Sequence, residues 1–328
     1  MSKIQSPYDT SSQGGFFRRF VALIGNVYLV SMLVYLVLRL AFGSGTWWLA
    51  LLNSFAIYTF APALVLFILT LLTANWRDMI RLGLLCLLAI VWFGPFFQPA
   101  PSPAQRGVAL TVITLNMPSA DHVQDAFDWV RDHPPDVLLL QRVPPEMADG
   151  IDALRDILPE QTAAGDGKMT LSRLPIIEQA ESYTVIDVDG REVLVYNVHF
   201  SRPSLPHPRF DALDGVPFLD DMTRYDEAVR NAEIRDLLAV LDGETRPYIV
   251  GGNFNMSQHS LIYSQVRLVM RDSFRDTSAG LGATWPTHLP LLRLDYVWHS
   301  RDFVALETLV GADIGADHLP LSARLDLR

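Results

Sequence analysis

Apolar residues dominate the first hundred positions, where three long apolar runs are separated by short polar connections: 20–42, 47–73 and 82–97. A helix of about 20 apolar residues crosses a bilayer, so the pattern predicts a membrane domain over 1–97 with three transmembrane helices at about 18–42, 47–73 and 79–97. A cleaved signal peptide is the alternative interpretation of the first run. That run is too long for one, and no small-residue cleavage site stands out.

Basic residues predict the orientation of these helices, because cytoplasmic loops carry the excess of Lys and Arg. Lys3, Arg18 and Arg19 precede the first run, and Arg77 and Arg81 lie between the second and third. We therefore expect a multi-pass protein of the plasma membrane, with a cytoplasmic N-terminus and an extracytoplasmic C-terminal domain, periplasmic or extracellular. Within the runs we expect a kink and a snorkelling side chain, at Pro62 and Arg39 respectively.

After a proline-rich linker at 98–105, the pattern changes to short alternating segments, which are typical of strands interleaved with helices. This arrangement predicts an α/β sandwich with loops gathered at one end. The expected strands are 108–116, 136–141, 168–172, 176–188, 192–199, 248–253, 294–299, 303–309 and a final one after 318. Of these, 294–299 and 303–309 are expected to form a hairpin. The expected helices are 121–132, 149–158 and 224–241.

Charge and cysteine content restrict the chemistry of the soluble part. Residues 1–105 hold 6 basic and 2 acidic side chains, which leaves 20 of the chain's 26 basic and 34 of its 36 acidic residues after position 105. Nucleic-acid binding depends on neutralising phosphates with Lys and Arg, so this acidic balance argues against such a partner. The single cysteine, Cys86, lies in an apolar run, which rules out a disulfide framework or a cysteine metal site in the soluble part.

Polar side chains stand where several expected strands end, and such ends can converge on one pocket. Each has an ordinary structural interpretation as a turn residue, a structural histidine or a strand-edge partner. They are Asn116, His199, Asn255, Asp295 and the pair Asp317 and His318.

The ordered set of motifs resembles the endonuclease/exonuclease/phosphatase superfamily. The matching segments are TVITLN 111–116, PDVLLLQ 135–141, LSRLP 171–175, YNVH 196–199, RNAEIR 230–235, GGNFN 251–255, TWP 284–286, LDYV 294–297 and GADHLP 315–320. The resemblance implies a four-layer α/β sandwich of the DNase I-like type over 106–328, preceded here by the three transmembrane helices.

The resemblance also implies a reaction, the metal-activated hydrolysis of a phosphoester, usually with Mg²⁺. It assigns catalytic roles to His199, Asp295, His318 and Asn255, and metal contacts to Asn116 and Asp317.

Two positions depart from the family pattern. Arg142 stands where the family has a metal-binding Glu, and Asn253 stands where it has an Asp that positions or activates water. The site's formal charge therefore rises by three units relative to that pattern. A cation about 4 Å from a guanidinium pays roughly 4 kcal/mol per unit of charge at an effective dielectric near 20. We therefore expect no bound metal, although Mg²⁺ is the cofactor that the resemblance implies.

Three alternatives keep ligand binding or metal binding open. Glu146 could supply the missing carboxylate after a loop shift, or Asp317 alone could hold a metal with waters. The third is that Arg142 itself binds a phosphate oxygen with its fork of donors.

The leading functional hypothesis is a membrane-tethered protein whose metal-dependent hydrolysis is lost or weakened, and which acts as a binding or accessory subunit of a membrane complex. The alternative is an active Mg²⁺-dependent phosphodiesterase or phosphatase on a lipid headgroup or other small phosphoester. A third hypothesis is a domain retained only for its folded surface. The partners that these hypotheses name are the lipid bilayer, other membrane subunits and a phosphate-containing small molecule or lipid.

Overall fold

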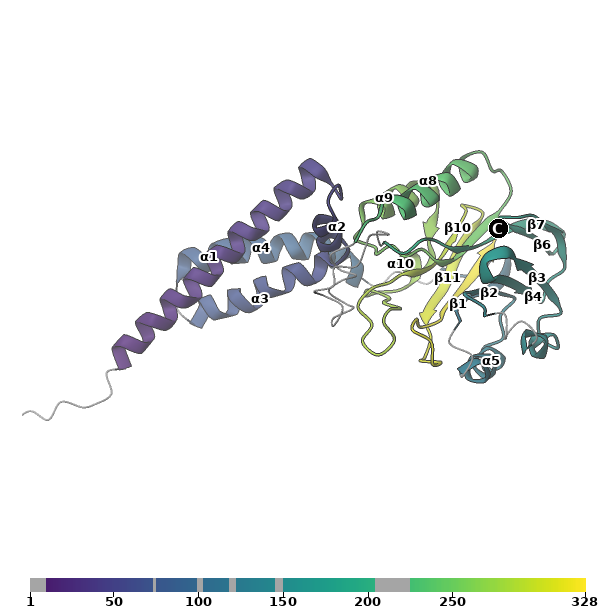
Figure 1. Ribbon diagram of the computed structural model, residues 1–328, viewed down its shortest axis with the longest axis horizontal. Coiled ribbons are helices and arrows are strands. Elements are labelled where there is room, and N and C mark those ends of the chain that lie inside the picture. The colour runs from purple at the N-terminus through teal and green to yellow at the C-terminus, as the bar shows by residue number, and fades with distance from the viewer. Residues whose placement is uncertain (1–9, 73–74, 99–102, 118–121, 145–149, 204–224) are drawn as a thin grey trace, which may run out of the picture. The chain divides into compact units, whose positions relative to one another are not determined.

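The computed structural model describes residues 10–72, 75–98, 103–117, 122–144, 150–203 and 225–328 (Figure 1). It divides into a helical unit, Met1–Pro95, and an α/β unit, Phe96–Arg328. Residues 99–102 of the expected linker and Glu146 lie outside the described residues.

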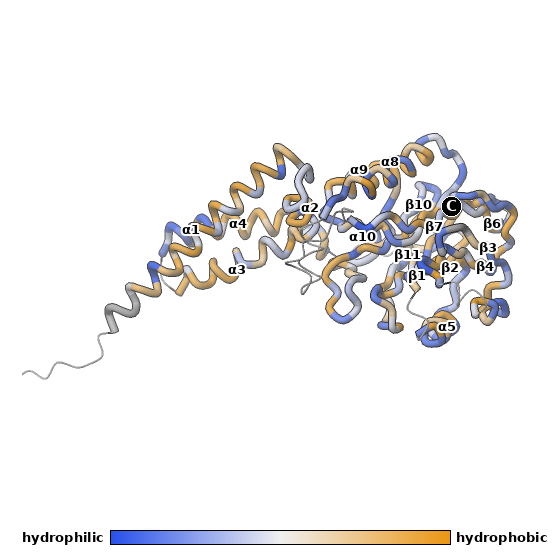
Figure 2. Tube along the Cα trace, viewed as in Figure 1, coloured by the Kyte–Doolittle hydropathy of each residue, from blue (hydrophilic) through white to orange (hydrophobic). Residues whose placement is uncertain are grey.

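The helical unit consists of α1 (Thr10–Phe42), α2 (Trp47–Ser54), α3 (Ala56–Leu72) and α4 (Trp76–Phe93). Two helices in the described part of the chain, within 15–42 and 76–97, are long and apolar enough to cross a membrane. A third span exists if α2 and α3 count together, although they are bent by 69°. Figure 2 shows how apolar these helices are along most of their length.

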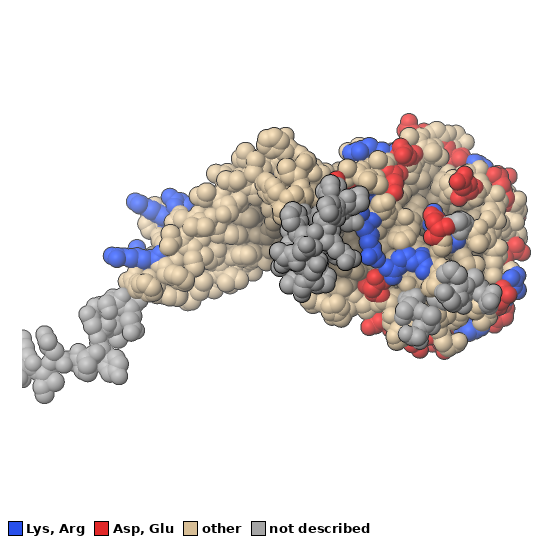
Figure 3. Space-filling view, viewed as in Figure 1, with Lys and Arg blue, Asp and Glu red and all other residues tan. Residues whose placement is uncertain are grey.

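The bend in the second apolar run lies at Phe55, between α2 and α3. Pro62 lies inside α3, where the expected kink remains a prediction. A buried contact accompanies the bend, since the Tyr35 hydroxyl lies 3.1 Å from the Asn53 side chain. Asn53 also donates to the Gly43 carbonyl at 2.9 Å, so polar groups join the ends of α1 and α2. On the face that Figure 3 shows, Lys and Arg atoms of this unit are visible at one of its ends.

The α/β unit contains two six-stranded sheets. The strand order is β11-β12-β1-β2-β4-β3 in one sheet and β5-β6-β7-β8-β10-β9 in the other. The strands are β1 (Val108–Asn116), β2 (Val137–Gln141), β3 (Glu160–Ala164), β4 (Lys168–Ser172), β5 (Ile176–Gln179), β6 (Thr184–Val188), β7 (Arg191–His199), β8 (Tyr248–Asn253), β9 (Arg271–Asp272), β10 (Asp295–His299), β11 (Phe303–Val310) and β12 (Leu321–Leu327). The helices are α5 (Val123–Asp132), α8 (Ala228–Asp242), α9 (Leu261–Val269) and α10 (Ser273–Thr277).

Three apolar clusters fix the layers of this unit. Side chains alternate between the two faces of a strand, so one set from each sheet meets in the middle, with Val112 and Leu139 facing Val195 and Ile249. The opposite set of the first sheet packs on α5, and that of the second sheet packs on α8 and α9. The order of layers is therefore helix, sheet, sheet, helix (Figure 1).

Three expected elements differ from the structure. The single strand expected over 176–188 is two antiparallel strands, β5 and β6. Strands β10 and β11 do not form a hairpin, because β10 pairs with β8 and β9 whereas β11 pairs with β12 in the other sheet. Val297 of β10 and Ala305 of β11 both belong to the central core between the two sheets. The short connection from β10 to β11 therefore crosses from one sheet to the other. The helix expected over 149–158 is present only in part: within the described residues, 150–151 are α-helical, Asp152–Leu154 form a 3-10 helix, and a turn follows over 155–157.

A buried histidine makes the stability of this unit depend on pH. His299 in β10 is fully buried, and its ring Nδ1 lies 2.9 Å from the Ser300 carbonyl. Burial lowers the pKa of His299 from its ordinary value of 6.5 to about 4. As pH falls below about 6.5, the unfolded chain takes up this proton before the folded chain does, so stability is lost.

We predict that His299→Gln makes stability less dependent on pH between pH 6.5 and 4. The wild type should lose about 1.4 kcal/mol more per pH unit than this variant over that window, because only its unfolded state is protonated there. Thermal unfolding of the detergent-solubilised chain at a series of pH values measures the difference. His288→Gln, at an exposed position, is the control. Parallel curves for wild type and His299→Gln would contradict the assignment.

Candidate functional site at the strand ends

The ends of four central strands meet at one edge of the sandwich. β1 and β2 are parallel neighbours in one sheet and end at Asn116 and Gln141, which are register partners. β7 and β8 are parallel neighbours in the other and end at His199 and Asn253, also register partners. β10 runs antiparallel to β8, so its first residue, Asp295, pairs with Asn253.

Strand periodicity directs these polar side chains into the space between the sheets. Residues an even number of positions apart on a strand lie on the same face, so Asn116 shares a face with Leu110 and Val112. In the same way Asn253 shares a face with Ile249. All three apolar residues belong to the central core between the sheets. The apolar core therefore gives way to polar groups where the strands end.

A hydrogen-bonded pair joins the two sheets just below this edge. The Gln141 amide donates to the Asn197 side-chain oxygen at 2.8 Å. Asn197 in turn donates to the backbone carbonyls of Leu140 at 3.0 Å and Met169 at 2.9 Å. Both residues are buried, and these bonds use their polar atoms to hold β7 against β2.

The turn after β8 requires glycine at one position. Gly252 has φ 138°, and a Cβ there would lie 1.9 Å from the Val198 carbonyl oxygen. Beyond it, the Asn253 side-chain oxygen accepts the Asn255 backbone N–H at 2.8 Å. Asn255 has a left-handed backbone, φ 47°, and donates from its side chain to the Phe200 carbonyl at 2.7 Å. These bonds fix the carboxamide of Asn253.

His318 lies between an acidic and a neutral partner. Its Nδ1 is 2.7 Å from the Asp295 carboxylate, which also accepts the Thr284 hydroxyl at 2.6 Å. The Asn253 side-chain nitrogen lies 3.5 Å from the ring of His318. Because His318 is only 3% exposed, Asp295 can hold the ring orientation by this hydrogen bond.

Arg142 forms a two-pronged ion pair with Asp317. Its two terminal nitrogens lie 3.1 and 2.6 Å from the two carboxylate oxygens, and it also donates to the Met117 carbonyl at 3.4 Å. Arg142 has φ 53°, an uncommon backbone for a residue with a side chain. A second cation, Arg202, lies 3.9 Å from the same carboxylate.

The positive charges of Arg142 and Arg202 help to lower the pKa of two neighbouring residues, Asp317 and His199. Burial by itself would raise the pKa of Asp317, but the hydrogen bonds from Arg142 and the nearby cations outweigh it and lower that pKa below its ordinary value. Burial also lowers the pKa of His199, and the charges of Arg142 and Arg202 lower it further. His199 therefore stays neutral at pH 7.

The side chain of Asn116 is buried without a partner. It is 2% exposed, and neither its oxygen nor its nitrogen has a hydrogen-bond partner among the described residues. A buried amide without partners costs about 1–3 kcal/mol, so such a group calls for an explanation.

All eight of the expected site residues that the structure describes lie at this strand-end edge and its adjoining loops. Direct contacts join Arg142 to Asp317, and Asn253 to Asn255 and His318. Sequence reasoning missed Arg202 and Thr284 as site residues. Thr284 belongs to a motif that the sequence contains, so its position beside Asp295 could have been suspected. Arg202 is part of an aperiodic loop and carries no such signal.

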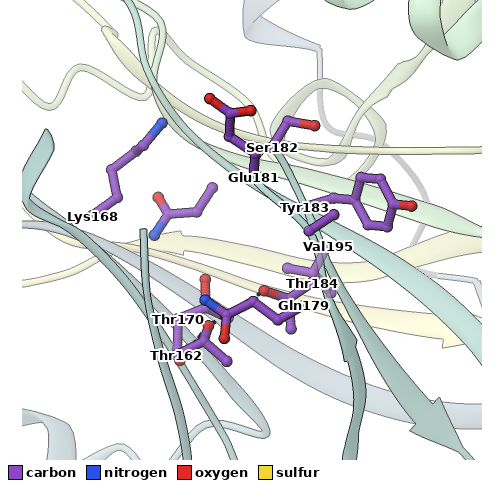
Figure 4. A pocket seen from close by; sticks show the side chains of 11 residues that line it. Thr162, Lys168, Thr170, Gln179, Glu181, Ser182, Tyr183, Thr184 and Val195 are labelled. Atoms are coloured by element: carbon purple, nitrogen blue, oxygen red, sulfur yellow. Dashed lines mark hydrogen bonds between the residues drawn. The ribbon is translucent and has the colours of Figure 1, made fainter. Parts of the chain in front are cut away.

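A small hollow adjoins the site along β7. Its lining residues include Val195 and Asn197, which share a strand face with His199. Figure 4 shows Glu181 and Ser182 on one side of it, facing Thr162 and Thr170. The hydroxyls of Thr162 and Thr184 lie 3.3 Å apart across the two sheets. The hollow is thus polar and was not expected from the sequence.

The chain belongs to the endonuclease/exonuclease/phosphatase family. The family's sequence pattern matches residues 113–318, which is more than half of the chain. The match includes the first and the last of the candidate site residues in the sequence, Asn116 and His318. Its fold is accordingly of the DNase I-like α/β type. No curated protein sequence gives a significant match to the chain.

Solved structures share this fold at low sequence identity. A Bacteroides vulgatus endonuclease/exonuclease/phosphatase is 16% identical, with a TM-score of 0.51, covering 67% of this chain and all of that protein. A humanized D. rerio TDP2 is 13% identical, with a TM-score of 0.50, covering 66% of this chain and 99% of that one. A Leptotrichia buccalis family protein is also 13% identical, with a TM-score of 0.50 and coverage of 66% and 100%. Identities this low establish the fold alone.

Members of this family usually depend on a metal ion, but the donor set here does not fit one. The described residues contain no group of three or more His, Cys, Asp or Glu side chains able to hold an ion. Asp317, an expected ligand, is already paired with Arg142. A dication about 4 Å from that guanidinium would meet a repulsion of roughly 8 kcal/mol at an effective dielectric near 20.

We predict that Gly252→Ala destabilises the protein by about 3 kcal/mol, because the new Cβ would collide with the Val198 carbonyl and force an unfavourable backbone. The matched control is Gly243→Ala, at the end of α8, where φ is −97° and a Cβ meets nothing within 4 Å. Thermal unfolding of both variants tests this. Equal stabilities would show that the close approach of β7 and β8 does not require glycine.

Proposed function

We propose that this chain is a membrane-tethered family member whose metal-dependent hydrolysis is lost or greatly weakened, and which acts as a binding or accessory subunit. One observation carries the proposal: Arg142 occupies the place of the family's metal-binding carboxylate and binds Asp317 through both oxygens. The ion pair satisfies the charge of Asp317, so a metal ion would have to displace an internal cation.

Asn253 supports the same conclusion. A carboxamide has no basicity with which to take a proton from water, unlike the family's aspartate. Its oxygen is also committed to the Asn255 backbone N–H at 2.8 Å. The residue therefore preserves the shape of the turn without the charge that activates a nucleophile.

The helical unit supports a tether. It offers two or three helices with the length and apolar character of a bilayer span. Four of its basic residues lie near helix starts: Arg18 and Arg19 in the N-terminal part of α1, ahead of the first apolar run, and Arg77 and Arg81 at the start of α4. By the positive-inside rule these residues face the cytoplasm of the plasma membrane, and an odd number of spans places the α/β unit outside. The partners are then the lipid bilayer and other membrane subunits, and the acidic α/β unit argues against nucleic acid.

An active Mg²⁺-dependent phosphodiesterase or phosphatase on a lipid headgroup or small phosphoester is the second candidate. The intact relay of Thr284, Asp295 and His318 favours it, because the family uses such an oriented histidine against phosphoryl charge. This candidate requires a rearranged metal site, with Arg142 displaced from Asp317.

We predict that the wild-type chain shows no Mg²⁺- or Mn²⁺-dependent hydrolysis of p-nitrophenyl phosphate or bis-p-nitrophenyl phosphate above a His318→Ala background. Neither metal should raise its melting temperature. The double variant Arg142→Glu, Asn253→Asp places two new carboxylates beside Asp317 and should melt several degrees higher with metal than with EDTA, because the metal relieves their repulsion. Product release and thermal unfolding, both measured on the detergent-solubilised chain, are the readouts.

Turnover by the wild type that EDTA abolishes would overturn the proposal in favour of the active enzyme. The double variant serves as the positive control for metal binding, and Arg235→Gln on the exposed face of α8 serves as a control for loss of positive charge elsewhere.

We predict that the α/β unit is labelled from outside the cell. In a Cys86→Ala background, Ala239→Cys on α8 should react with a membrane-impermeant thiol reagent in intact cells. Ser12→Cys, ahead of the first apolar run, should react only after permeabilisation. The reverse pattern would refute the proposed orientation.

A further inference from the structure

Two guanidinium groups share one carboxylate at the strand-end edge. Arg142 binds both oxygens of Asp317, and Arg202 approaches the same group at 3.9 Å. Two further acids nearby have other partners: Asp295 is engaged by His318 and Thr284, and Glu233 accepts from the backbone N–H and the hydroxyl of Ser201. One positive charge is therefore left over between Arg142, Arg202 and Asp317.

Both arginines retain donors for a ligand. A guanidinium has five N–H groups, and the contacts of Arg142 with described residues, to Asp317 and Met117, use three of them. Arg202 is 61% exposed, and 3.9 Å is beyond hydrogen-bond distance. Its ion pair with Asp317 is thus weak, and most of its side chain is exposed to solvent.

Asn116 supplies an independent observation. It is the register partner of Gln141, the residue before Arg142, and it faces the space between the sheets. Its amide has neither a donor nor an acceptor partner among the described residues, although the side chain is 98% buried. A bound oxyanion would accept the N–H of this amide and remove the cost of leaving it unpaired.

We propose that Arg142, Arg202 and Asn116 form a binding site for a phosphate monoester group that works without a metal ion. The proposal rests on the non-hydrolytic function above, and it names the ligand chemistry of that same site. Arg142 takes the electrostatic place of the metal, as an internal cation that Asp317 holds in position.

Charge and shape favour a phosphate monoester over a carboxylate or a phosphodiester. A monoester carries between about −1.5 and −2 charges at pH 7 and three free oxygens. Two guanidinium forks and one amide can each contact a different oxygen of that group. A diester has a single negative charge and two free oxygens, so it would leave one of the three groups without a partner.

The same chemistry could come from a soluble phosphate or from a lipid such as phosphatidic acid. The experiment therefore titrates glycerol 3-phosphate into the full chain with EDTA present, by calorimetry, in nanodiscs of phosphatidylcholine with and without phosphatidic acid. Weaker apparent binding with phosphatidic acid identifies the lipid as a competing ligand. Equal binding identifies a soluble ligand.

We expect the wild type to bind glycerol 3-phosphate in EDTA, and added Mg²⁺ to leave the affinity within twofold. Arg202→Gln should weaken binding tenfold or more, because a charge-assisted donor is lost. Arg202→Lys, which keeps the charge but loses the fork, should weaken it severalfold. Arg235→Gln on α8 is the matched control and should bind within twofold of the wild type.

No binding by the wild type in EDTA, binding that requires Mg²⁺, or an Arg202→Gln variant equal to the wild type would each overturn the inference. If Arg202→Gln fails to fold, the binding of glycerol 3-phosphate by Arg202→Lys tests the inference instead. An Arg202→Lys variant that binds as tightly as the wild type would contradict it. The hydrolysis assays above are separate. A chain that neither hydrolyses nor binds phosphate refutes this site while leaving the loss of catalysis in place.

Discussion

The alternation of side chains along paired parallel strands is the constraint on which the rest of this molecule depends. Because β1 and β2 are parallel, and β7 and β8 are parallel, their carboxyl ends lie at one edge of each sheet. The inward side chains are apolar along the first part of these strands and become polar toward their carboxyl ends. The same geometry that builds the core therefore delivers Asn116, His199 and Asn253 to one place.

At that place the positive charges outnumber the carboxylate that they share. Arg142 binds both oxygens of Asp317, and Arg202 approaches the same group at 3.9 Å. Around this ion pair, Asp295 orients His318, and the Asn253 side chain accepts the Asn255 backbone N–H. Our proposals of lost hydrolysis and of anion binding both rest on this arrangement.

Much of the fold followed from local pattern. β1, β4 and β8 lie where the alternation and the Gly-Gly turn predict them, because period-two burial is written directly in those residues. The hairpin expected between β10 and β11 does not form, because β10 pairs with β8 in one sheet and β11 pairs with β12 in the other. Which strands pair depends on tertiary packing, and the local pattern of a strand does not contain it. Likewise the second apolar run is divided at Phe55 into α2 and α3, which are bent by 69°, and the apolar pattern did not predict this break because no charged residue interrupts the run there.

The sequence by itself determined the family, the apolar helices, and the two substitutions that alter the site, Arg142 and Asn253. Each of these is a property of residue identity and spacing. Only the tertiary structure decided what surrounds these residues: that Arg142 turns toward Asp317, that Arg202 approaches the same carboxylate, and that the buried side chain of Asn116 has no hydrogen-bond partner among the described residues. The ion pair of Arg142 and Asp317 joins residues 175 positions apart in the sequence, and only tertiary packing brings such residues within reach.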